Sequence, residues 1–381
     1  MRRTLRLWLA ALVLMVMPSA AEAQTSRAAE IGAAQAEKAR RLAAEQPSTT
    51  ERFITFATRP RTSAFYPWFG KAYRGSGLAA GVGYEHRLPS GGGVNLVAGG
   101  NQRGSWIGSA NFRLRPVGNP RQLHVVARET RANGLAFYGV GAGTTVTDRT
   151  KYDVRQREAL LEGSIPIARG LVVTGSAGYH GLTTLDAPAA VNIDQRIDYL
   201  RLSAGARVDW RPAPDYATRG GSARIDWIRR AADRRDRATF DEIETELTQL
   251  VPLVNEQFTL AFRALATTTR VQDGHAVPFF FLPYVGSGNT LRGFANNRFK
   301  DRSRLVFSAE YRWRASRIID MALFADHGAV GPALADIDRD TFHTTWGAGL
   351  RFHTPATTVF RFDVARSREG WRLVFGRSQP F

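Results

Sequence analysis

The sequence predicts an all-β protein, a transmembrane antiparallel β-barrel of sixteen strands. Three observations lead to this prediction. The chain begins with an export signal, most of the remainder alternates apolar and polar residues with period two, and no later segment has the ~20 apolar residues of a membrane-spanning helix. Because lipid leaves the backbone groups of an open sheet edge without partners, exported amphipathic strands span a membrane as a closed barrel.

Residues 1–23 have the organisation of a secretory signal peptide. Three arginines near the start form a positive region, Leu7–Met17 is an apolar run of 11 residues, and Ala21-Glu22-Ala23 is a small-x-small cleavage site. A membrane-anchoring helix is the alternative, but the apolar run is shorter than the ~20 residues that span a bilayer. We therefore expect cleavage after Ala23 and export.

The charge of the chain restricts its partners. The formal net charge is +18, and loss of three arginines and Glu22 with the signal, a net of +2, leaves +16. A soluble protein this basic would suggest nucleic acid, but export argues against nucleic acid as a partner. The expected partners are outer-membrane lipids, the phosphates of lipopolysaccharide, and anionic solutes in a lumen. Because the chain has no cysteine, disulfides and thiolate metal sites are excluded.

Residues 24–75 are expected to form a short N-terminal arm and a lead-in to the barrel. Up to Gln46 the arm is rich in Ala, Glu, Lys and Arg, which favours a helix, and Pro47-Ser48 is a stop signal. The arm has few large apolar residues, which favours a frayed or disordered arm; a helix in the periplasm or inside the barrel is the alternative. The lead-in contains Pro60 and Pro67. Residues 76–381 are expected to be the outer-membrane β-barrel.

Alternation along residues 76–381 predicts strands with one apolar and one polar face. Leu200, Leu202 and Val208, for example, alternate with Arg201. A soluble sandwich is the alternative. Against it, the polar faces of successive strands are dense in Gly, Arg, Ser and Thr, and aromatic residues stand at strand ends, as in the interfacial girdles of membrane barrels. These aromatic residues are Tyr84, Trp106, Trp210, Trp227, Tyr311, Trp313 and Trp371.

The pattern supplies fifteen strands directly. They are 76–88, 93–102, 104–115, 121–131, 150–165, 170–181, 196–211, 218–230, 238–251, 254–268, 302–314, 317–327, 342–353, 357–367 and 370–381. Bacterial single-chain barrels usually have an even number of strands. We therefore expect a sixteenth, at Phe53–Thr58 or near Phe137.

A glycine-flanked arginine segment separates the last five expected strands from the others. It reads Gly288-Asn289-Thr290-Leu291-Arg292-Gly293-Phe294 and is followed by Asn297-Arg298-Phe299-Lys300-Asp301. Two strand motifs follow, Ala309-Glu310-Tyr311-Arg312-Trp313 and Phe324-Ala325-Asp326-His327-Gly328-Ala329-Val330, and the chain ends at Phe381. In these motifs and in their position the chain resembles the BamA/TamA-like outer-membrane barrel superfamily, also known as bacterial surface antigen barrels.

The resemblance implies that the arginine segment folds into the lumen and that Arg292 pairs with acids of the inner wall. Parity agrees independently, because Glu310 and Asp326 lie opposite the apolar faces of their strands and an acid that faced lipid would be costly. The resemblance also makes the terminal aromatic part of the signal read by the assembly machinery. The expected loop and lumen residues are Leu291, Arg292, Gly293, Phe294, Glu310, Asp326 and Gly328, and the expected assembly signal is Phe381.

The resemblance implies a component of protein or lipid insertion or translocation at the outer membrane. Family members carry repeated periplasmic POTRA domains, whereas only about fifty residues lie here between the signal and the first clear strand. We therefore expect a form that lacks POTRA domains and works with a separate periplasmic partner protein. The alternative is a passive or gated anion-preferring pore, or a structural barrel. Nine arginines have lumen parity: Arg113, Arg201, Arg207, Arg224, Arg263, Arg312, Arg314, Arg361 and Arg372.

No pattern indicates an enzyme. The seven histidines are scattered, and neither a His-x-x-x-His pair nor a Gly-x-Ser-x-Gly elbow occurs. Glu242, Glu244 and Glu246 form an acidic ladder on one strand face, which would either bind a cation or face a solvated lumen. We favour the lumen and expect no catalytic residue, cofactor or metal.

Overall fold

The computed structural model describes residues 32, 33, 35, 37, 63–116, 119, 121–185, 196–212, 216–254, 257–354, 357–376 and 378–381. Internal contacts divide the chain into two units, Met1–Gln46 and Pro47–Phe381. The described residues of the first unit are helical. The signal peptide expected at 1–23 lies outside the described residues. No helix among the described residues has the length and apolarity needed to cross a membrane.

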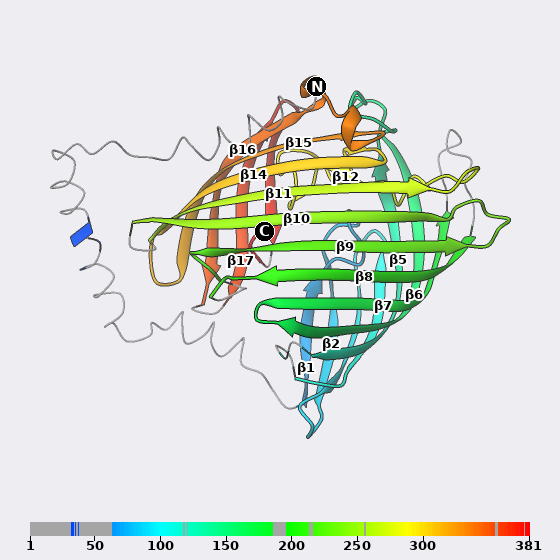
Figure 1. Ribbon diagram of the computed structural model, residues 1–381, viewed down its shortest axis with the longest axis horizontal. Helices are drawn as coiled ribbons and strands as arrows, with labels where there is room; N and C mark the ends of the chain where they lie inside the picture. Colours follow the sequence, from blue (N-terminus) through cyan, green and yellow to red (C-terminus); the bar gives the residue numbers. More distant parts are fainter. Residues whose placement is uncertain are drawn as a thin grey trace. The chain divides into compact units, whose positions relative to one another are not determined.

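The second unit is built on one antiparallel sheet of 16 strands, in which each strand pairs with its neighbours along the chain. The sheet curls round, and in Figure 1 the red strands β16 and β17 pass behind the green strands. The architecture is the predicted transmembrane β-barrel. Its strands are β1 Ser63–Gly70, β2 Ala79–Arg87, β3 Gly93–Gly100, β4 Trp106–Arg113, β5 Gln122–Phe137, β6 Thr150–Ala168, β7 Leu171–Leu185, β8 Arg196–Asp209, β9 Gly220–Ala232, β10 Phe240–Val254, β11 Phe258–Val271, β14 Ser303–Arg314, β15 Ile319–Gly331, β16 His343–His353, β17 Thr358–Ser367 and β18 Gly370–Gly376.

Four short elements lie outside the main sheet, in the connections between its strands. A second sheet contains only β12 (Tyr284–Val285) and β13 (Phe299–Lys300), both from the connection between β11 and β14. Two 3-10 turns, Leu334–Asp336 and Arg339–Thr341, lie between β15 and β16.

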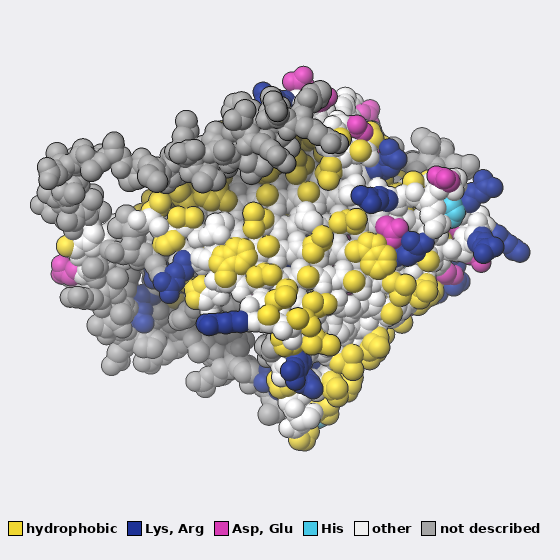
Figure 2. Space-filling model, viewed as in Figure 1, with side chains coloured by type: hydrophobic (Ala, Val, Ile, Leu, Met, Phe, Trp, Pro, Cys, Tyr) yellow, Lys and Arg dark blue, Asp and Glu magenta, His cyan; other side chains and the backbone are white. Residues whose placement is uncertain are grey.

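Alternation along each strand separates an apolar outer face from the lumen. On β14, Phe307 points outward and is 44% exposed, whereas Glu310 is buried. On β15, Leu323 is 51% exposed and Asp326 is buried. Large apolar side chains exposed on successive strands are unfavourable in water and suit a hydrocarbon environment. Figure 2 shows hydrophobic side chains over the middle of this face and charged side chains gathered at its right-hand end.

The sixteenth strand of the sheet is β1, Ser63–Gly70, which the sequence pattern did not predict. The expectation of a separate strand near Phe137 was wrong, because Phe137 belongs to β5, and the other expected position, Phe53–Thr58, lies outside the described residues. The barrel therefore begins before the boundary expected at residue 76. Pro67 explains the error, because proline cannot donate to a ladder and indicates a break in a strand. In β1 it is tolerated because β1 is an edge of the sheet and pairs only with β2.

The connections between strands are longest at one end of the barrel. Residues 138–149, 272–302 and 332–342 connect strands at this end, whereas 169–170 and 315–318 do so at the other. Long connections in outer-membrane barrels are extracellular and short turns are periplasmic. On this principle the end that carries 272–302 is extracellular, and the chain enters β1 and leaves β18 on the periplasmic side.

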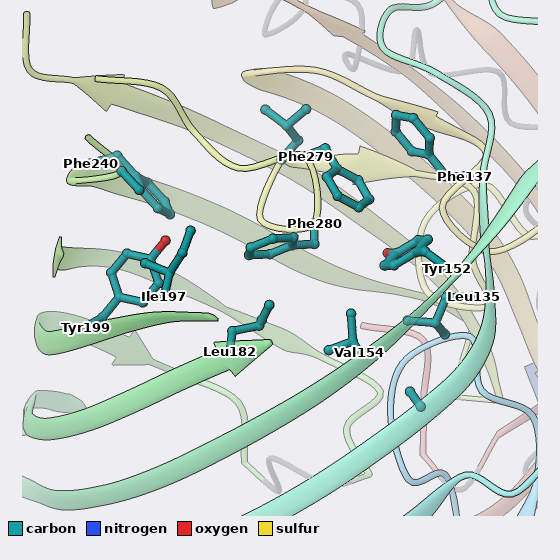
Figure 3. Close-up of a cluster of buried hydrophobic side chains, with 13 residues drawn as sticks. Leu135, Phe137, Tyr152, Val154, Leu182, Ile197, Tyr199, Phe240, Phe279 and Phe280 are labelled. Atoms are coloured by element: carbon teal, nitrogen blue, oxygen red, sulfur yellow. The ribbon is translucent and has the colours of Figure 1, made fainter. Parts of the chain in front are cut away.

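An apolar core fills part of the lumen, which was not expected because barrel interiors are usually polar. The run Phe279-Phe280-Phe281-Leu282 from connection 272–302 packs on inward side chains of β5 to β8 and β10. Phe279 meets the rings of Phe137 and Tyr152 edge-on, with centroids 4.9 and 4.8 Å away. Figure 3 shows these side chains converging. The buried members are Ala132, Leu135, Phe137, Tyr152, Val154, Leu182, Ile197, Tyr199, Ala238, Phe240, Phe279, Phe280 and Leu282.

Candidate functional site

The connection 272–302 forms a hairpin that reaches into the lumen. β12 and β13 pair antiparallel, and residues 286–298 between them, here called the arginine loop, form the tip. Gly286 starts the loop with a φ of 97°, and a Cβ there would lie 2.4 Å from the carbonyl oxygen of Ala295. Glycine is therefore required for both conformation and space.

Apolar contacts and close backbone packing seat the tip of the arginine loop. Leu291 and Phe294 are buried, and Leu291 packs against Gly328 on β15, where a Cβ would lie 3.4 Å from Leu291 Cδ2. Gly293 lies against β17, where the Ser367 hydroxyl donates to its carbonyl oxygen at 2.9 Å. The buried apolar cluster around the tip comprises Leu265, Val285, Leu291, Phe294, Phe299, Val306 and Val330.

Arg292 projects from the tip and is 1% exposed. Its Nε and Nη2 donate to the two carboxylate oxygens of Asp326 at 2.8 and 2.7 Å, and its Nη1 donates to Glu310. The guanidinium carbon lies 3.4 Å from the centroid of the Phe324 ring. The planar guanidinium matches a carboxylate through two parallel hydrogen bonds, which fixes orientation as well as charge. The structure thus places Arg292, Glu310 and Asp326 in direct contact.

Arg292 belongs to a larger buried charge network. Arg351 on β16 donates to Glu310 at 3.0 Å and to Asp363 at 2.7 Å, and Arg312 donates to Glu310 at 2.7 Å. Sequence reasoning missed Arg351, although alternation with the outward Trp346, Ala348, Leu350 and Phe352 indicated its inward parity. The members of the network are Arg292, Arg312, Arg351, Arg361, Glu310, Asp326 and Asp363.

The network holds the loop backbone as well as its arginine. Arg361 Nη2 donates to the carbonyl oxygen of Gly288 at 2.8 Å and to Asn289 Oδ1 at 3.1 Å. Arg263 on β11 donates to the carbonyl oxygen of Asn289 at 2.5 Å. These arginines therefore satisfy loop carbonyls that the lumen would otherwise leave without partners.

Burial and neighbouring charge set the ionisation of Arg292. Burial alone would lower its pKa, but the carboxylates of Asp326 and Glu310 raise that pKa above its usual value. The guanidinium therefore remains charged. Removing one partner from a buried ion pair costs ~3–5 kcal/mol, so the pairing constrains the position of the loop strongly.

A second anchor follows the tip. Arg298 Nη2 donates to the carbonyl oxygen of Thr144 at 2.7 Å, and its Nε donates to Glu369 at 2.7 Å. The Gly141 amide donates to the carbonyl oxygen of Lys300 at 2.7 Å. The hairpin is therefore attached to the β5–β6 connection on one side and to the β17–β18 turn on the other.

The amine of Lys300 is buried beside the lumen core. It donates to the carbonyl oxygen of Phe279 at 3.3 Å and lies 6.0 Å from the ring centroid of Tyr152. Burial lowers the pKa of Lys300 to about 7. Its amine therefore changes charge near neutral pH.

The acidic ladder of β10 is paired with arginines. The closest pairs are Arg230–Glu242 at 3.1 Å, Arg224–Glu244 at 2.5 Å, Arg304–Glu244 at 2.6 Å and Arg263–Glu246 at 2.6 Å. No cluster of three or more potential metal ligands occurs within the described residues. The ladder therefore contributes to the charge pairs of the lumen.

The C-terminal residue does not continue the last strand. The pattern predicted a strand running to Phe381 with the outward parity of Trp371, but β18 ends at Gly376. The Phe381 ring lies 5.2 Å from the guanidinium of Arg312 and 5.9 Å from that of Arg263. The Phe381 ring is therefore attracted to two arginines that face the lumen. Alternation alone does not predict this inward position.

Fold and site together define a class of protein, a transmembrane β-barrel whose lumen holds a loop fixed by a buried arginine. Residues 232–372 match the Omp85 superfamily domain. This stretch includes the arginine loop and all members of its charge network. No curated protein matches the chain.

Solved structures share the fold. BamA from Haemophilus ducreyi lacking POTRA domains 1-3 matches with a TM-score of 0.64 and 16% identity, over 84% of this chain and 70% of its own. CdiB from Acinetobacter baumannii matches with a TM-score of 0.52 and 15% identity, over 82% of this chain and 58% of its own. CdiB from Escherichia coli matches with a TM-score of 0.55 and 11% identity, over 83% of this chain and 62% of its own. With the domain match, these findings confirm the resemblance. The C-terminal stretch 232–372 thus matches the Omp85 superfamily domain, and the chain as a whole shares the fold of the BamA and CdiB barrels.

Proposed function

We propose that this barrel takes part in the insertion or translocation of proteins or lipids at the bacterial outer membrane. The Omp85 superfamily match and the structural likeness to BamA and CdiB support a role of this kind. A passive anion-preferring pore is the alternative. The apolar core and the arginine loop occupy the lumen, which does not suit a wide water-filled channel.

The observation that carries the proposal is the seam between β1 and β18. Hydrogen-bonded neighbours run from β1 to β18, and within the described residues no ladder joins these two strands. Each strand therefore has an edge of backbone donors and acceptors that lipid does not satisfy. A strand of a substrate protein can pair with such an edge by β-augmentation. The seam is the place where we propose that a substrate strand enters.

Locking the seam tests the proposal. Because the chain has no cysteine, cysteines introduced on the two edge strands, Tyr66→Cys on β1 and Arg372→Cys on β18, can be treated with cleavable bis-maleimides of increasing length without background labelling. The assay measures folding of a denatured outer-membrane protein into liposomes that contain this barrel, with and without a periplasmic fraction. The unlocked barrel should accelerate folding, and the bridged barrel should not until the bridge is cleaved. The two single-cysteine variants, treated identically, are matched controls.

Two results would contradict the proposal. A barrel that never accelerates folding but carries a steady anion current would be a passive pore. A bridged barrel as active as the single-cysteine controls would show that substrates do not enter at the seam. Acceleration only with the periplasmic fraction would support the expected periplasmic partner.

We also propose that lipopolysaccharide is the lipid partner at the outer leaflet. Arg155 and Arg157 share the outward parity of Leu161, which is 50% exposed, and lie toward the extracellular end of β6. Glu129 on β5 pairs with both, at 2.5 and 2.9 Å. Guanidinium groups suit phosphate. The outward arginines at this level are Arg131, Arg155, Arg157, Arg196 and Arg229.

Liposomes with and without lipid A provide the test. Lipid A should raise the thermal midpoint of the intact barrel, and the rise should shrink in Arg155→Gln/Arg157→Gln. Arg207→Gln, a lumen-facing variant, should keep the full rise. An equal rise in all three proteins would exclude these arginines from the contact.

A further inference from the structure

A cavity of about 670 Å³ lies in the extracellular half of the lumen. Its walls are residues of β4 to β11 and β14, and its other side is formed by the turn after β1 and by hairpin residues Phe280–Tyr284, Asn297 and Lys300. It is separate from the arginine network, whose members do not line it. Its volume falls within the ~300–1,000 Å³ of small-molecule sites. We call it the lumen chamber.

Basic side chains outnumber acidic ones on the chamber wall. Three carboxylates line it, and each has a basic partner on the same wall: Arg128 with Glu158 at 3.6 Å, Arg230 with Glu242 at 3.1 Å and Arg304 with Glu244 at 2.6 Å. Four further basic side chains on the wall form no ion pair in the described part of the chain: Lys71, Arg74, Arg201 and Lys300. Arg74 is hydrogen-bonded to Tyr284, and wall carboxylates act on Arg74 and Arg201 only at longer range. The chamber therefore carries an excess of positive charge that the protein does not neutralise.

Buried polar atoms on the same wall also lack partners. Both ring nitrogens of His180 have no hydrogen bond, and the nearest carboxylate oxygen, Glu158 Oε1, is 3.9 Å from Nε2. Thr130 Oγ1 and Arg230 Nε are likewise without a hydrogen bond. All three residues are more than nine-tenths buried and line the chamber. Buried polar groups are normally satisfied, so these atoms indicate a polar occupant.

Aromatic side chains form the remaining part of the chamber wall. Phe280, Phe281, Tyr152 and Tyr284 line it. The Arg230 guanidinium carbon lies 4.5 Å from the Phe281 ring centroid, and the His180 ring meets Phe281 edge-on at 5.3 Å. An anionic group and an apolar or aromatic group can therefore both be accommodated, because cations and aromatic rings are adjacent.

We propose that the lumen chamber binds a small phosphorylated molecule that also carries an apolar or aromatic part. Phosphate monoesters hold nearly two negative charges at neutral pH. Such a group would neutralise more of the positive charge on the chamber wall than a single carboxylate. Arg201 is the main anchor, because among the described residues its guanidinium donates only to the Ser176 hydroxyl, at 3.1 Å, and so has donors left for phosphate oxygens. The rings of Phe280 and Phe281 contact the apolar part.

Calorimetry on the full-length barrel in detergent micelles tests this site with phenyl phosphate as the probe. Phenyl phosphate should bind more tightly than inorganic phosphate, which lacks the ring, and than benzoate, which lacks the second charge. Arg201→Gln should weaken phenyl phosphate binding about tenfold or more, because it removes charge-assisted hydrogen bonds. Arg207→Gln is the matched control: Arg207 lies on the same strand and face, outside the chamber.

A second variant protects the test against misfolding. Lys71 is exposed and lies in the turn after β1, so Lys71→Gln should fold normally and still weaken binding. No binding of phenyl phosphate to the folded barrel, or equal binding by wild type and both chamber variants, would overturn the proposal. Repeating the titration with a glucosamine phosphate, as in a lipid headgroup, distinguishes that source from a soluble aromatic phosphate. The proposal does not depend on the insertion role, since binding is measured without substrate proteins.

Discussion

Replacing Arg292 by alanine should release the arginine loop while the barrel stays folded. Asp326 would lose both guanidinium hydrogen bonds and keep two neutral donors, the Thr345 hydroxyl at 3.1 Å and the backbone amide of residue 292 at 3.3 Å. Glu310 would keep Arg312 and Arg351. One buried carboxylate is therefore left without its charged partner, at a cost of ~3–5 kcal/mol. Because Arg292 and Asp326 are each 1% exposed, water screens little of this cost.

Opening of the loop relieves the cost, since water then reaches the carboxylate. The same ~3–5 kcal/mol should raise the open population roughly 100- to 4,000-fold. When loop closure is fast relative to cleavage, the rate of proteolysis follows that population. Chymotrypsin digestion with mass spectrometry should therefore show faster cleavage at Phe294 and Phe299. Heat-modifiable migration should change little, because the strand ladders are intact.

Three variants make the reasoning refutable. Arg292→Lys keeps the charge but loses the two-pronged contact and should be intermediate. Arg292→Ala/Asp326→Ala removes the stranded carboxylate and should recover part of the protection. Arg113→Ala is the control, since Arg113 also faces the lumen but pairs with Glu85, at 3.4 Å, away from the loop. Cleavage of Arg292→Ala no faster than wild type, or a double variant more sensitive than the single, would refute the argument.

Three further predictions follow from other parts of the loop and the C-terminus. Burial gives Lys300 a pKa of about 7, against ~10.4 in an unfolded chain. Between these two values the seated loop therefore binds fewer protons than the released loop, and raising the pH stabilises the seated loop. Protection of the loop from protease should rise from pH 7 toward pH ~10 and stay at its lowest below pH 7. Lys300→Met should remove this rise, and a flat wild-type profile would contradict the assignment. Deleting Phe381 should lower the yield of folded barrel in outer membranes, and unchanged heat-modifiable migration and yield would show that the ring is dispensable. Removing residues 284–300 should convert small, intermittent, anion-preferring conductance in planar bilayers into a larger current, and a large cation-selective current from the intact protein would contradict a filled, positive lumen.

Alternation in the sequence was sufficient to predict most of the barrel and part of the site. It placed Glu310 and Asp326 on the inner wall, because an apolar residue at every second position identifies the lipid face without reference to distant parts of the chain. The contact of both acids with Arg292 rested on the resemblance. Alternation along a strand predicts whether a side chain faces lipid or the lumen, but it does not predict which loop contacts that side chain.

Other features depend on contacts that a local pattern does not contain. The run Phe279–Leu282 has no periodicity, and its partners come from strands far apart in the sequence. β1 was missed because Pro67 indicates a break, and only its place at the sheet edge makes proline acceptable. Phe381 has outward parity, but its ring lies over two lumen arginines once β18 has ended.

The seat of Arg292 is assembled from four consecutive strands, which has a consequence for the biogenesis of the barrel. Glu310 comes from β14, Asp326 from β15, Arg351 from β16 and Asp363 from β17. A slip of one residue in any of these pairings would turn that strand's charged member from the lumen to the lipid face. The loop can therefore make all of these contacts only after the C-terminal strands have reached their correct register, so a fully docked loop distinguishes a barrel in register from a misregistered one.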